Sequence, residues 1–141
     1  TGEAIFALMA LGAEGVQMGT RFALTDESSA SDIFKEYCLR LNEGDTKLLL
    51  KKLAPTRLVT NSFRDRVEAA EGRGASAEEL RELLGRGRAK KGIFEGDLEE
   101  GELEIGQVAA LFRRRQSVDE VMKELLEGYR RASDKIRSAG L

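Results

Sequence analysis

Apolar positions near the start of the chain recur at helical spacing, and a very short apolar run follows them. The helical face consists of Ala4, Ile5, Leu8 and Leu11. Gly12 is a residue at which such a helix ends. The run from Val16 to Gly19 lacks polar/apolar alternation, as a strand buried on both faces does. A helix followed by a short buried strand is the second half of a β-α-β unit, so this pattern predicts a parallel sheet.

The middle of the chain alternates helical and strand-like patterns around polar turns. One helical face is formed by Ile33, Phe34, Tyr37, Cys38 and Leu41. Leu48–Leu50 and Leu58–Val59 then fit two short strands joined through Pro55, although a run of leucine and lysine also fits a helix. Asn61 is suited to cap a helix that extends to Glu71.

Two capping boxes punctuate the second half of the chain. Ser76 with Glu79 predicts a short helix that ends before Gly85, and Ser117 with Glu120 begins a last helix, expected to extend to about residue 138. Its apolar stripe comprises Val118, Val121, Met122, Leu125, Leu126 and Tyr129. Between the two boxes, glycines predict repeated bends over 85–106, and a further helix is expected over 107–114. The chain therefore reads as a short α/β segment followed by a mostly helical one.

Composition narrows the class of protein without identifying it. The 141 residues are 41% hydrophobic and 34% charged, as in a globular domain, and the net charge of -2 provides no field for nucleic acid. No apolar run is long enough to span a bilayer. The single cysteine, Cys38, suits a reducing compartment, and the chain contains no histidine. Because the sequence opens within a helical pattern and without methionine, we expect a C-terminal piece of a longer protein.

The Gly19-Thr20 pair is the first candidate for chemistry. It follows the predicted strand, and ligands of parallel α/β folds bind at the carboxyl ends of the strands. Glycine permits close approach of a ligand, and consecutive backbone N–H groups suit a phosphate. On spacing alone, a plain glycine turn explains the pair better than a phosphate site does.

Longer stretches resemble one family of proteins in order along the chain. "ALGAEGVQMGTRF", the following "ES" and the lysine of "IFKEY" are similar to segments of the nitronate monooxygenase, or 2-nitropropane dioxygenase-like, family. That family includes the FMN-dependent enoyl-acyl-carrier-protein reductases. The resemblance continues through "TRLVTNSF", "EGDLEEGELEIGQVAAL" and "SVDEVMKELLEGY". It is specific for the family and separates its members poorly.

The resemblance implies a fold and a cofactor site. The family fold is a (β/α)8 barrel that binds FMN, so residues 1–25 would be the last helix and strand of this TIM barrel. Residues 26–141 would be a mostly helical added domain with the C-terminal helices. The residues that match the family's FMN contacts are Gln17, Met18, Gly19 and Thr20. The catalytic histidine and the glycine turn that completes the phosphate grip lie upstream in the family, so no catalytic residue is expected here. No metal site is expected either, because the chain has no histidine and its acids lack the spacing of an EF-hand loop.

The resemblance also implies an activity. We expect oxidation of alkyl nitronates with FMN and oxygen, in a cytoplasmic enzyme that acts on a small molecule. An FMN-dependent enoyl-acyl-carrier-protein reductase is the alternative within the family. A helical interaction module without chemistry, built on the last amphipathic helix, is the alternative from another class. A homodimer is compatible with the sequence, and we expect neither nucleic acid nor a membrane as partner. This piece of the protein is not expected to be active alone.

Several other features favour structural roles. Arg21 is expected to pair with Asp26 or Glu27 rather than with phosphate. Arg57 and Asn61 are expected to tie a connection to the following helix rather than to contact substrate. Gln107 fits a place near the flavin and a helix cap equally well. The basic runs "RGRAKK" and "RRRQ" and the acids of "EGDLEEGELE" are expected to be solvated surface. Cys38 is expected to be a core residue.

Overall fold

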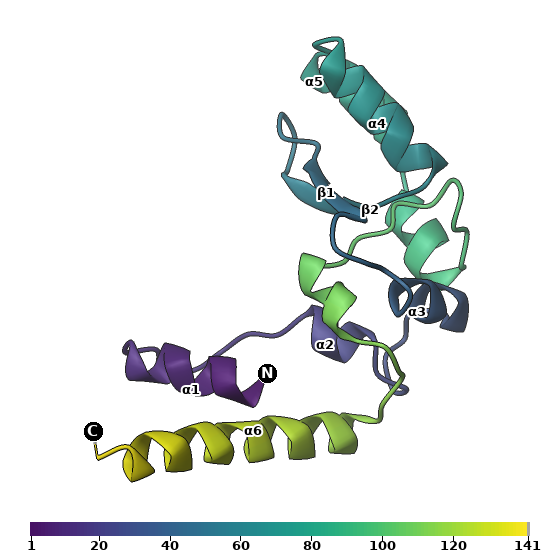
Figure 1. The fold of residues 1–141 in the computed structure, drawn as a ribbon. Coiled ribbons are helices and arrows are strands. Elements are labelled where there is room, and N and C mark those ends of the chain that lie inside the picture. Colours follow the sequence, from purple (N-terminus) through teal and green to yellow (C-terminus); the bar gives the residue numbers. More distant parts are fainter. Residues whose placement is uncertain (141) are drawn as a thin grey trace.

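The computed structural model describes residues 1–140, which form helices and one small sheet arranged as an L (Figure 1). In chain order the elements are α1 (Gly2–Ala10), α2 (Thr20–Ala23), α3 (Asp32–Cys38), β1 (Thr46–Leu49), β2 (Thr56–Val59), α4 (Ser62–Gly72), α5 (Ala77–Leu84), the π-helical turn η1 (Lys90–Phe94), the 3-10 helix η2 (Gln107–Leu111) and α6 (Val118–Ser138). Mixed α and β content with helices predominating agrees with the expected class.

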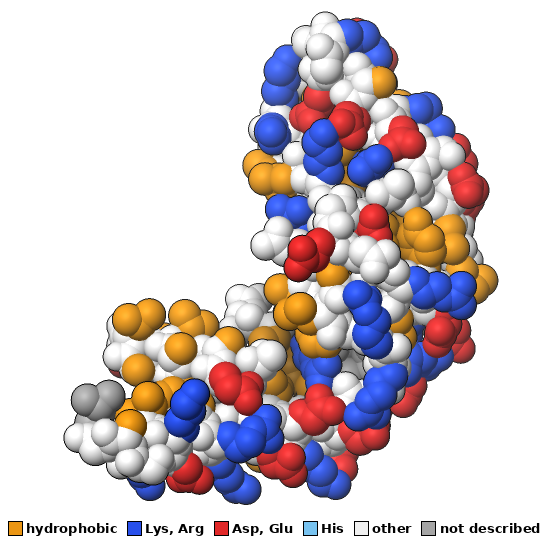
Figure 2. Space-filling view, in the orientation of Figure 1, with side chains coloured by type: hydrophobic (Ala, Val, Ile, Leu, Met, Phe, Trp, Pro, Cys, Tyr) orange, Lys and Arg blue, Asp and Glu red, His pale blue; other side chains and the backbone are white. Residues whose placement is uncertain are grey.

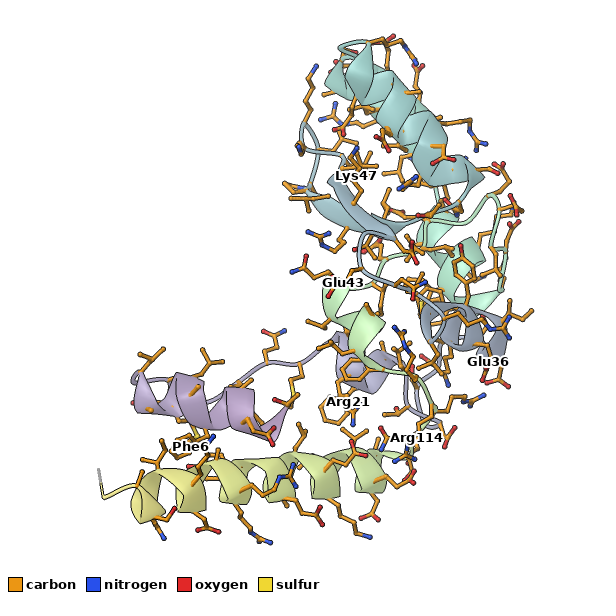
Figure 3. The ribbon with its side chains drawn as sticks, viewed as in Figure 1. Phe6, Arg21, Glu36, Glu43, Lys47 and Arg114 are labelled. Carbon is orange, nitrogen blue, oxygen red and sulfur yellow. The ribbon has the colours of Figure 1, made fainter. Side chains whose placement is uncertain are left out.

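The two helices from opposite ends of the chain, α1 and α6, form one arm of the L and run side by side in the same direction (Figure 1). Their backbones come very close, because a Cβ on Gly2 would collide with the Leu125 carbonyl oxygen and with Gly128. Phe6 points from α1 towards α6 (Figure 3), where its ring meets Tyr129 edge-on at 5.5 Å. The apolar stripe of α6 is therefore partly covered by α1.

The segment after α1 is extended but forms no strand, so the prediction of a strand over Val16–Gly19 is wrong for this chain. A strand is defined by hydrogen bonds to a neighbour, and no backbone N–H of residues 15–22 donates to an acceptor among the described residues. The extended stretch also ends sooner than expected, since Gly19 already has φ -93° and ψ -65° and precedes α2. Gly15–Met18 thus has the shape of a strand without a partner.

A narrow neck joins this arm to the rest of the molecule. Thr25 and Gln116, both buried, form a parallel bridge, and the Asp26 N–H donates to the Gln116 carbonyl oxygen at 3.0 Å. Next to the bridge, the Glu27 carboxylate accepts the N–H of Val118 at the start of α6. The chain leaves the α1–α6 arm at Thr25 and re-enters this arm at Gln116. The expected boundary after residue 25 stays a prediction, and α6 packs on α1 across it.

The buried Lys35 of α3 holds the loop beyond the neck. Its Nζ donates to the carbonyl oxygens of Asp26 at 3.2 Å and Ser28 at 2.7 Å. The "ES" pair and the lysine, which carried part of the family resemblance, therefore stabilise the local structure of this chain. Glu27 caps α6 and Lys35 fixes the loop that presents Glu27.

The second arm is built on a β-hairpin covered by α4 and α5 (Figure 1). β1 and β2 pair antiparallel, so the two-strand interpretation of this region is confirmed. Asn61 caps α4 as predicted, with its Oδ1 accepting the Arg64 N–H, and the capping boxes of α5 and α6 are both present. The core between hairpin and helices contains Leu49, Leu50, Leu58, Phe63 and Val67.

The glycine-rich segment between α5 and α6 packs more tightly than its composition suggests. A Cβ on Gly101 would collide with Gly92, so the two backbones lie in direct contact. This packing buries Glu102, of which only 7% is exposed, and the expectation that all acids of this segment lie at the surface is wrong there. Burial raises the pKa of Glu102 to about 7, and neighbouring Glu104 adds to the effect. The helix expected over 107–114 is the shorter η2, since Phe112 is already extended.

Candidate functional site

The four residues expected to contact FMN line one cavity at the inner corner of the L. The cavity has a volume of about 420 Å³, and its walls come from the start of α1, the extended segment with the start of α2, and η2. Its lining residues are Thr1, Ala4, Gln17, Met18, Gly19, Thr20, Arg21, Val108, Leu111 and Phe112. The fold thus brings Gln17, Met18, Gly19 and Thr20 together at a concave surface.

Backbone donors and open space make Gly19 and Thr20 suited to an anion. A Cβ built on Gly19 would meet no atom within 4 Å, so nothing in the described chain requires glycine at this position. The N–H groups of Thr20 and Arg21 have no described acceptor. At the start of α1, by contrast, the Thr1 hydroxyl and carbonyl oxygens already accept the N–H groups of Ala4 and Ile5. The anion-binding capacity of the cavity is therefore concentrated at residues 19–21.

The Thr20 hydroxyl connects the start of α2 to Gly106, the residue that precedes η2. Its Oγ1 accepts the N–H of Gly106 at 3.0 Å. A Cβ on Gly106 would stand 2.6 Å from this oxygen, so a larger residue would break the contact. Because the hydroxyl accepts from Gly106, its own proton is available to an acceptor in the cavity.

Arg21 makes a different ion pair from the one expected. Its guanidinium pairs with Glu124 of α6, not with Asp26 or Glu27, and lies 4.5 Å from the centre of the Phe112 ring. Glu27 is engaged at the N-terminus of α6, which leaves Glu124 as the neighbouring carboxylate. The expectation of a structural pair for Arg21 is correct, and the expected partners are wrong. Arg21 thereby ties α2, η2 and α6 together beside the cavity.

The apolar wall formed by η2 was missed at the sequence level. Val108 and Leu111 are 46% and 66% exposed, and together with Phe112 they face the segment that carries Thr20 across the cavity. The only sequence signal for this wall was the "GQVAAL" match to the family. Gln107 makes no capping hydrogen bond among the described residues and instead lines an adjoining cavity.

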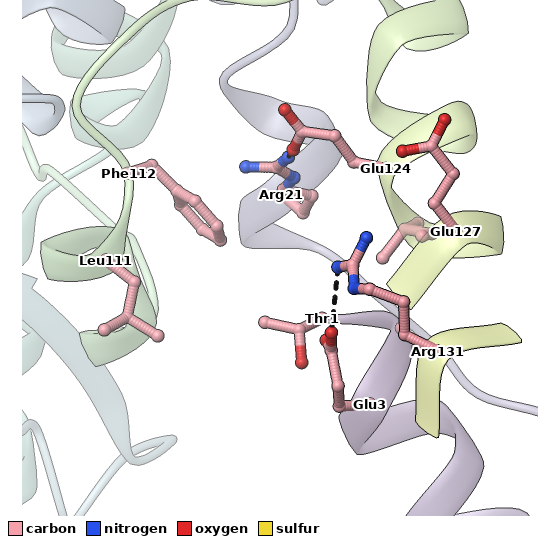
Figure 4. Close-up of a pocket in the computed structure, with 10 residues that line it drawn as sticks. Thr1, Glu3, Arg21, Leu111, Phe112, Glu124, Glu127 and Arg131 are labelled. Carbon is pink, nitrogen blue, oxygen red and sulfur yellow. Dashed lines mark hydrogen bonds and ion pairs between the residues drawn. The ribbon is translucent and has the colours of Figure 1, made fainter. Parts of the chain in front are cut away.

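Three smaller hollows surround the main cavity. One of about 280 Å³ lies between the start of α1, α6 and Phe112, where Arg131 bonds to Glu3 (Figure 4). One of about 400 Å³ shares Gly19 and Thr20 with the main cavity, and one of about 410 Å³ shares Val108 and Leu111 with it. Arg57 lines both of the latter hollows. The candidate site is therefore a group of connected surfaces at the inner corner.

Other residues with chemical potential lie apart from this corner. Cys38 is fully buried, and burial raises the pKa of its thiol to about 12. The thiol therefore stays protonated, which fits the expected core role and argues against a role as a nucleophile. The two basic runs face acids, with Lys91 on Asp97 and Arg115 on Asp26 as examples. Among residues 1–140 no cluster of side chains has the makeup of a metal site. Every helix in that range is too short or too polar to cross a bilayer.

Exposed apolar side chains continue from this corner along α1. Figure 2 shows hydrophobic side chains over α1 and at the inner corner of the L. Leu8, Met9 and Val16 belong to this surface, with exposed fractions of 48%, 42% and 36%. Parts of the faces of α1 and of the extended segment are therefore uncovered within the described chain.

Comparisons with known proteins agree on one family. The family model described as nitronate monooxygenase matches residues 1–128. A probable nitronate monooxygenase of Staphylococcus saprophyticus is 51% identical over 65 residues, which is 44% of this chain and 18% of that protein. One of Staphylococcus aureus is 38% identical over 74 residues, 50% of this chain and 20% of that protein. The matched region is thus less than a quarter of these relatives' length.

Solved structures give the same result. FabK from Thermotoga maritima superposes with a TM-score of 0.87 and 31% identity, over 98% of this chain and 44% of that chain. A nitroalkane oxidase from Streptomyces ansochromogenes superposes with a TM-score of 0.73 and 26% identity, over 96% of this chain and 38% of that chain. The described fold therefore spans less than half of either structure.

Proposed function

The chain belongs to the nitronate monooxygenase family, and from this premise we propose that it is part of an FMN-dependent enzyme that oxidises alkyl nitronates with oxygen. The single observation that carries the proposal is the cavity at the inner corner, where Gln17, Met18, Gly19 and Thr20 meet. The names of the matched relatives, nitronate monooxygenase and nitroalkane oxidase, support the substrate class. The reaction is assigned to a whole protein, because this chain covers less than half of the solved structures that it matches.

The residues present fit the phosphate end of FMN. Space beside Gly19 is open, and the N–H groups of Thr20 and Arg21 are available, as is the Thr20 hydroxyl proton. A phosphate accepts hydrogen bonds from such donors without needing a cation. We assign the phosphate contact to Gly19 and Thr20, and the edge of the flavin to Gln17 and Met18. Val108, Leu111 and Phe112 would then exclude water from that edge.

The proposed division of labour leaves the electron transfer to the cofactor. When bound, FMN supplies the acceptor for the electrons of the substrate and their passage to oxygen. The described residues bind and orient: Thr20 holds η2 through Gly106, and Arg21 holds α2 against α6 through Glu124. The lining of the main cavity contains no histidine or carboxylate that could remove a proton, and the carboxylates of the corner lie in the adjoining hollows. Proton transfer is assigned to the catalytic histidine that the family carries upstream of these residues.

The arrangement of α1, the extended segment and α6 supports a barrel position for this part of the chain. α1 and α6 run parallel, and the extended segment that follows α1 has unpaired backbone on both edges, as in a helix–strand–helix portion of a (β/α)8 barrel. In that reading residues 26–116 are an insertion between the eighth strand and the eighth helix. Ligands of such barrels bind at the C-terminal ends of the strands, which is where Gly19 and Thr20 lie in this reading.

An FMN-dependent enoyl-acyl-carrier-protein reductase is the second candidate. It is favoured by the likeness to FabK, which has the higher TM-score and identity of the two solved structures described above. The assay that separates the candidates uses full-length protein loaded with FMN. We expect oxygen uptake that depends on an alkyl nitronate, and little reduction of a crotonyl thioester by reduced nicotinamide. Thioester reduction without nitronate turnover would reject the first candidate.

The cofactor assignment is tested by two variants of full-length protein. Gly19→Val places a branched side chain in the open space that we assign to the phosphate, so FMN retention should fall strongly. Thr20→Ala keeps the backbone donor and loses the hydroxyl, for an expected cost of about 1.5–3 kcal/mol with a charged acceptor. Gly15→Val, four residues earlier and also with nothing within 4 Å of its Cβ, is the matched control. Equal FMN affinity of Gly19→Val and wild type, measured by fluorescence titration, removes the phosphate assignment.

A further inference from the structure

Arg57 differs from every other half-buried arginine in the described chain. The other four have carboxylate partners, in the pairs Arg21–Glu124, Arg64–Asp65, Arg88–Glu100 and Arg115–Asp26. Arg57 forms no salt bridge with any residue of 1–140. A half-buried guanidinium without a counter-charge can accept an anion from outside the described chain.

One side of the Arg57 guanidinium is fixed and the other is free. Nη1 donates to the carbonyl oxygen of Thr46 at 3.3 Å and to its hydroxyl oxygen at 3.2 Å. The backbone is held on both sides, because Arg57 pairs with Leu48 in the hairpin and its carbonyl oxygen accepts the N–H of Ile105. Nε and Nη2 have no acceptor among the described residues. These two nitrogens form the edge of the guanidinium that binds two oxygens side by side.

The side chain of Arg57 lies beside the proposed flavin site. It lines the hollow that contains Gly19 and Thr20, and also the one that contains Gln107 and Val108. Each hollow includes one carboxylate, Glu43 or Glu104, and neither pairs with Arg57. Figure 3 places Glu43 on the loop that precedes β1, above η2. A ligand at Arg57 would thus be next to the main cavity without occupying the phosphate contact at Gly19.

We propose that Arg57 binds the oxyanion group of the substrate, and that its free edge receives the two oxygens of a nitronate. The inference rests on the proposed function and names its recognition residue. A nitronate carries two oxygens on one planar nitrogen, with the geometry of a carboxylate, and a guanidinium edge matches such a pair. A phosphate group of a second substrate offers the same oxygen pair. A thioester carbonyl offers a single neutral oxygen.

The first measurement is equilibrium binding to full-length, FMN-loaded protein, with two unreactive probes. Sodium nitrate mimics the planar nitronate and inorganic phosphate mimics a phosphate ester, and both are titrated by following the flavin absorbance and by calorimetry. Arg57→Gln should weaken nitrate binding about tenfold or more, as loss of a charge-assisted pair does. Arg57→Lys keeps the charge without the edge and should lie between. Arg64→Gln, a half-buried arginine that lines none of these hollows, is the matched control and should bind as wild type does.

The second measurement is steady-state turnover of ethyl nitronate. Arg57→Gln should raise KM about tenfold with kcat changed far less, because the residue binds the substrate without touching the bond that reacts. Weaker nitrate binding with unchanged phosphate binding supports a nitronate. Weaker phosphate binding with unchanged nitrate binding overturns the nitronate assignment and favours a phosphate group of a second substrate.

The failure of this proposal is distinct from failure of the proposed function. A wild-type protein that binds nitrate or phosphate through Arg57 but does not turn over nitronate rejects the reaction and keeps the anion site. Nitrate and phosphate affinities that are equal in wild type, Arg57→Gln and Arg57→Lys overturn the proposal, whatever the turnover. Should Arg57→Gln lose its flavin, an unchanged nitrate affinity in Arg57→Lys overturns the assignment of the two-oxygen edge.

Discussion

The hairpin arm and the α1–α6 arm of the molecule are stabilised in different ways. In the hairpin arm, β1, β2, α4 and α5 enclose fully buried side chains such as Phe63, Val67 and Leu80. In the α1–α6 arm, Leu8 and Met9 are exposed, and the extended segment has unpaired backbone. The hairpin arm therefore has an apolar core of its own, whereas the other arm buries apolar surface mainly where α1 meets α6.

The difference shows which part of this chain has a surface suited to contact with other protein segments. Exposed apolar side chains and unpaired N–H groups coincide at α1 and residues 15–22, next to the candidate cofactor cavity. Scattered exposed apolar residues need no explanation, but apolar surface contiguous with unpaired backbone indicates an interaction surface. The hairpin arm supplies the rigid support for Arg57, and the α1–α6 arm supplies the surface on which we place FMN.

Removing Phe63 should have the largest effect on the comparison. Its ring is fully buried in the hairpin arm and lies 4.5 Å from the Arg88 guanidinium. Phe63→Ala should lower the free energy of unfolding of the 141-residue chain by about 3–5 kcal/mol. The paired variant Leu8→Ala removes a side chain that is 48% exposed and should change it by less than about 0.5 kcal/mol. Urea denaturation measures both, and equal losses would show that the arms are stabilised alike.

A methyl group at Gly2 should cause the next largest loss of stability, because it disrupts the close contact between the backbones of α1 and α6. The Cβ of Gly2→Ala would collide with backbone atoms of Leu125 and Tyr129, so α1 must move away from α6. We expect a loss of about 1–3 kcal/mol, typical of overpacking. Gly15→Ala meets nothing within 4 Å and is the control. Thermal denaturation that does not distinguish Gly2→Ala from Gly15→Ala contradicts the close packing of the two helices.

The smallest expected effect concerns pH and the buried carboxyl of Glu102. The folded protein holds a proton on this group up to about pH 7, whereas an unperturbed glutamate releases it near pH 4.5. The native state thus binds more protons between these values, and stability falls as pH rises. Between pH 5 and pH 8 the fall should be about 1–2 kcal/mol larger in wild type than in Glu102→Gln. Parallel pH profiles of the two proteins in urea denaturation would mean that Glu102 titrates normally.

Local signals predicted more of this chain than non-local ones did. The caps at Asn61, Ser76 and Ser117 depend on residues three positions away, and the helices they start were predicted. The strand at 16–19 was wrong because strand pairing needs a partner that no local pattern supplies. Arg21 was paired with the wrong acid because Glu124 is 103 positions distant in sequence.

The candidate site shows the same division. Gln17–Thr20 could be proposed from a contiguous motif, and their contact with FMN stays a prediction. The wall at Val108 and Leu111 and the free edge of Arg57 depend on how η2 and the hairpin meet the extended segment, which composition and periodicity do not encode. Burial of Glu102 was missed for a related reason, since it follows from contact between Gly92 and Gly101.

The bridge between Thr25 and Gln116 has a consequence for how such a chain can diversify. It brings the two ends of a long connection together, so the connection behaves as a closed loop whose ends are fixed. The entropy of closing a loop grows only with the logarithm of its length, and each doubling costs about 0.6 kcal/mol. Residues in the surface turns between the two ends can therefore be added or deleted at little cost in closure entropy, while α6 keeps its place along α1. Variation in the hairpin arm, including the surroundings of Arg57, is thereby separated from variation in the framework that we assign to the cofactor.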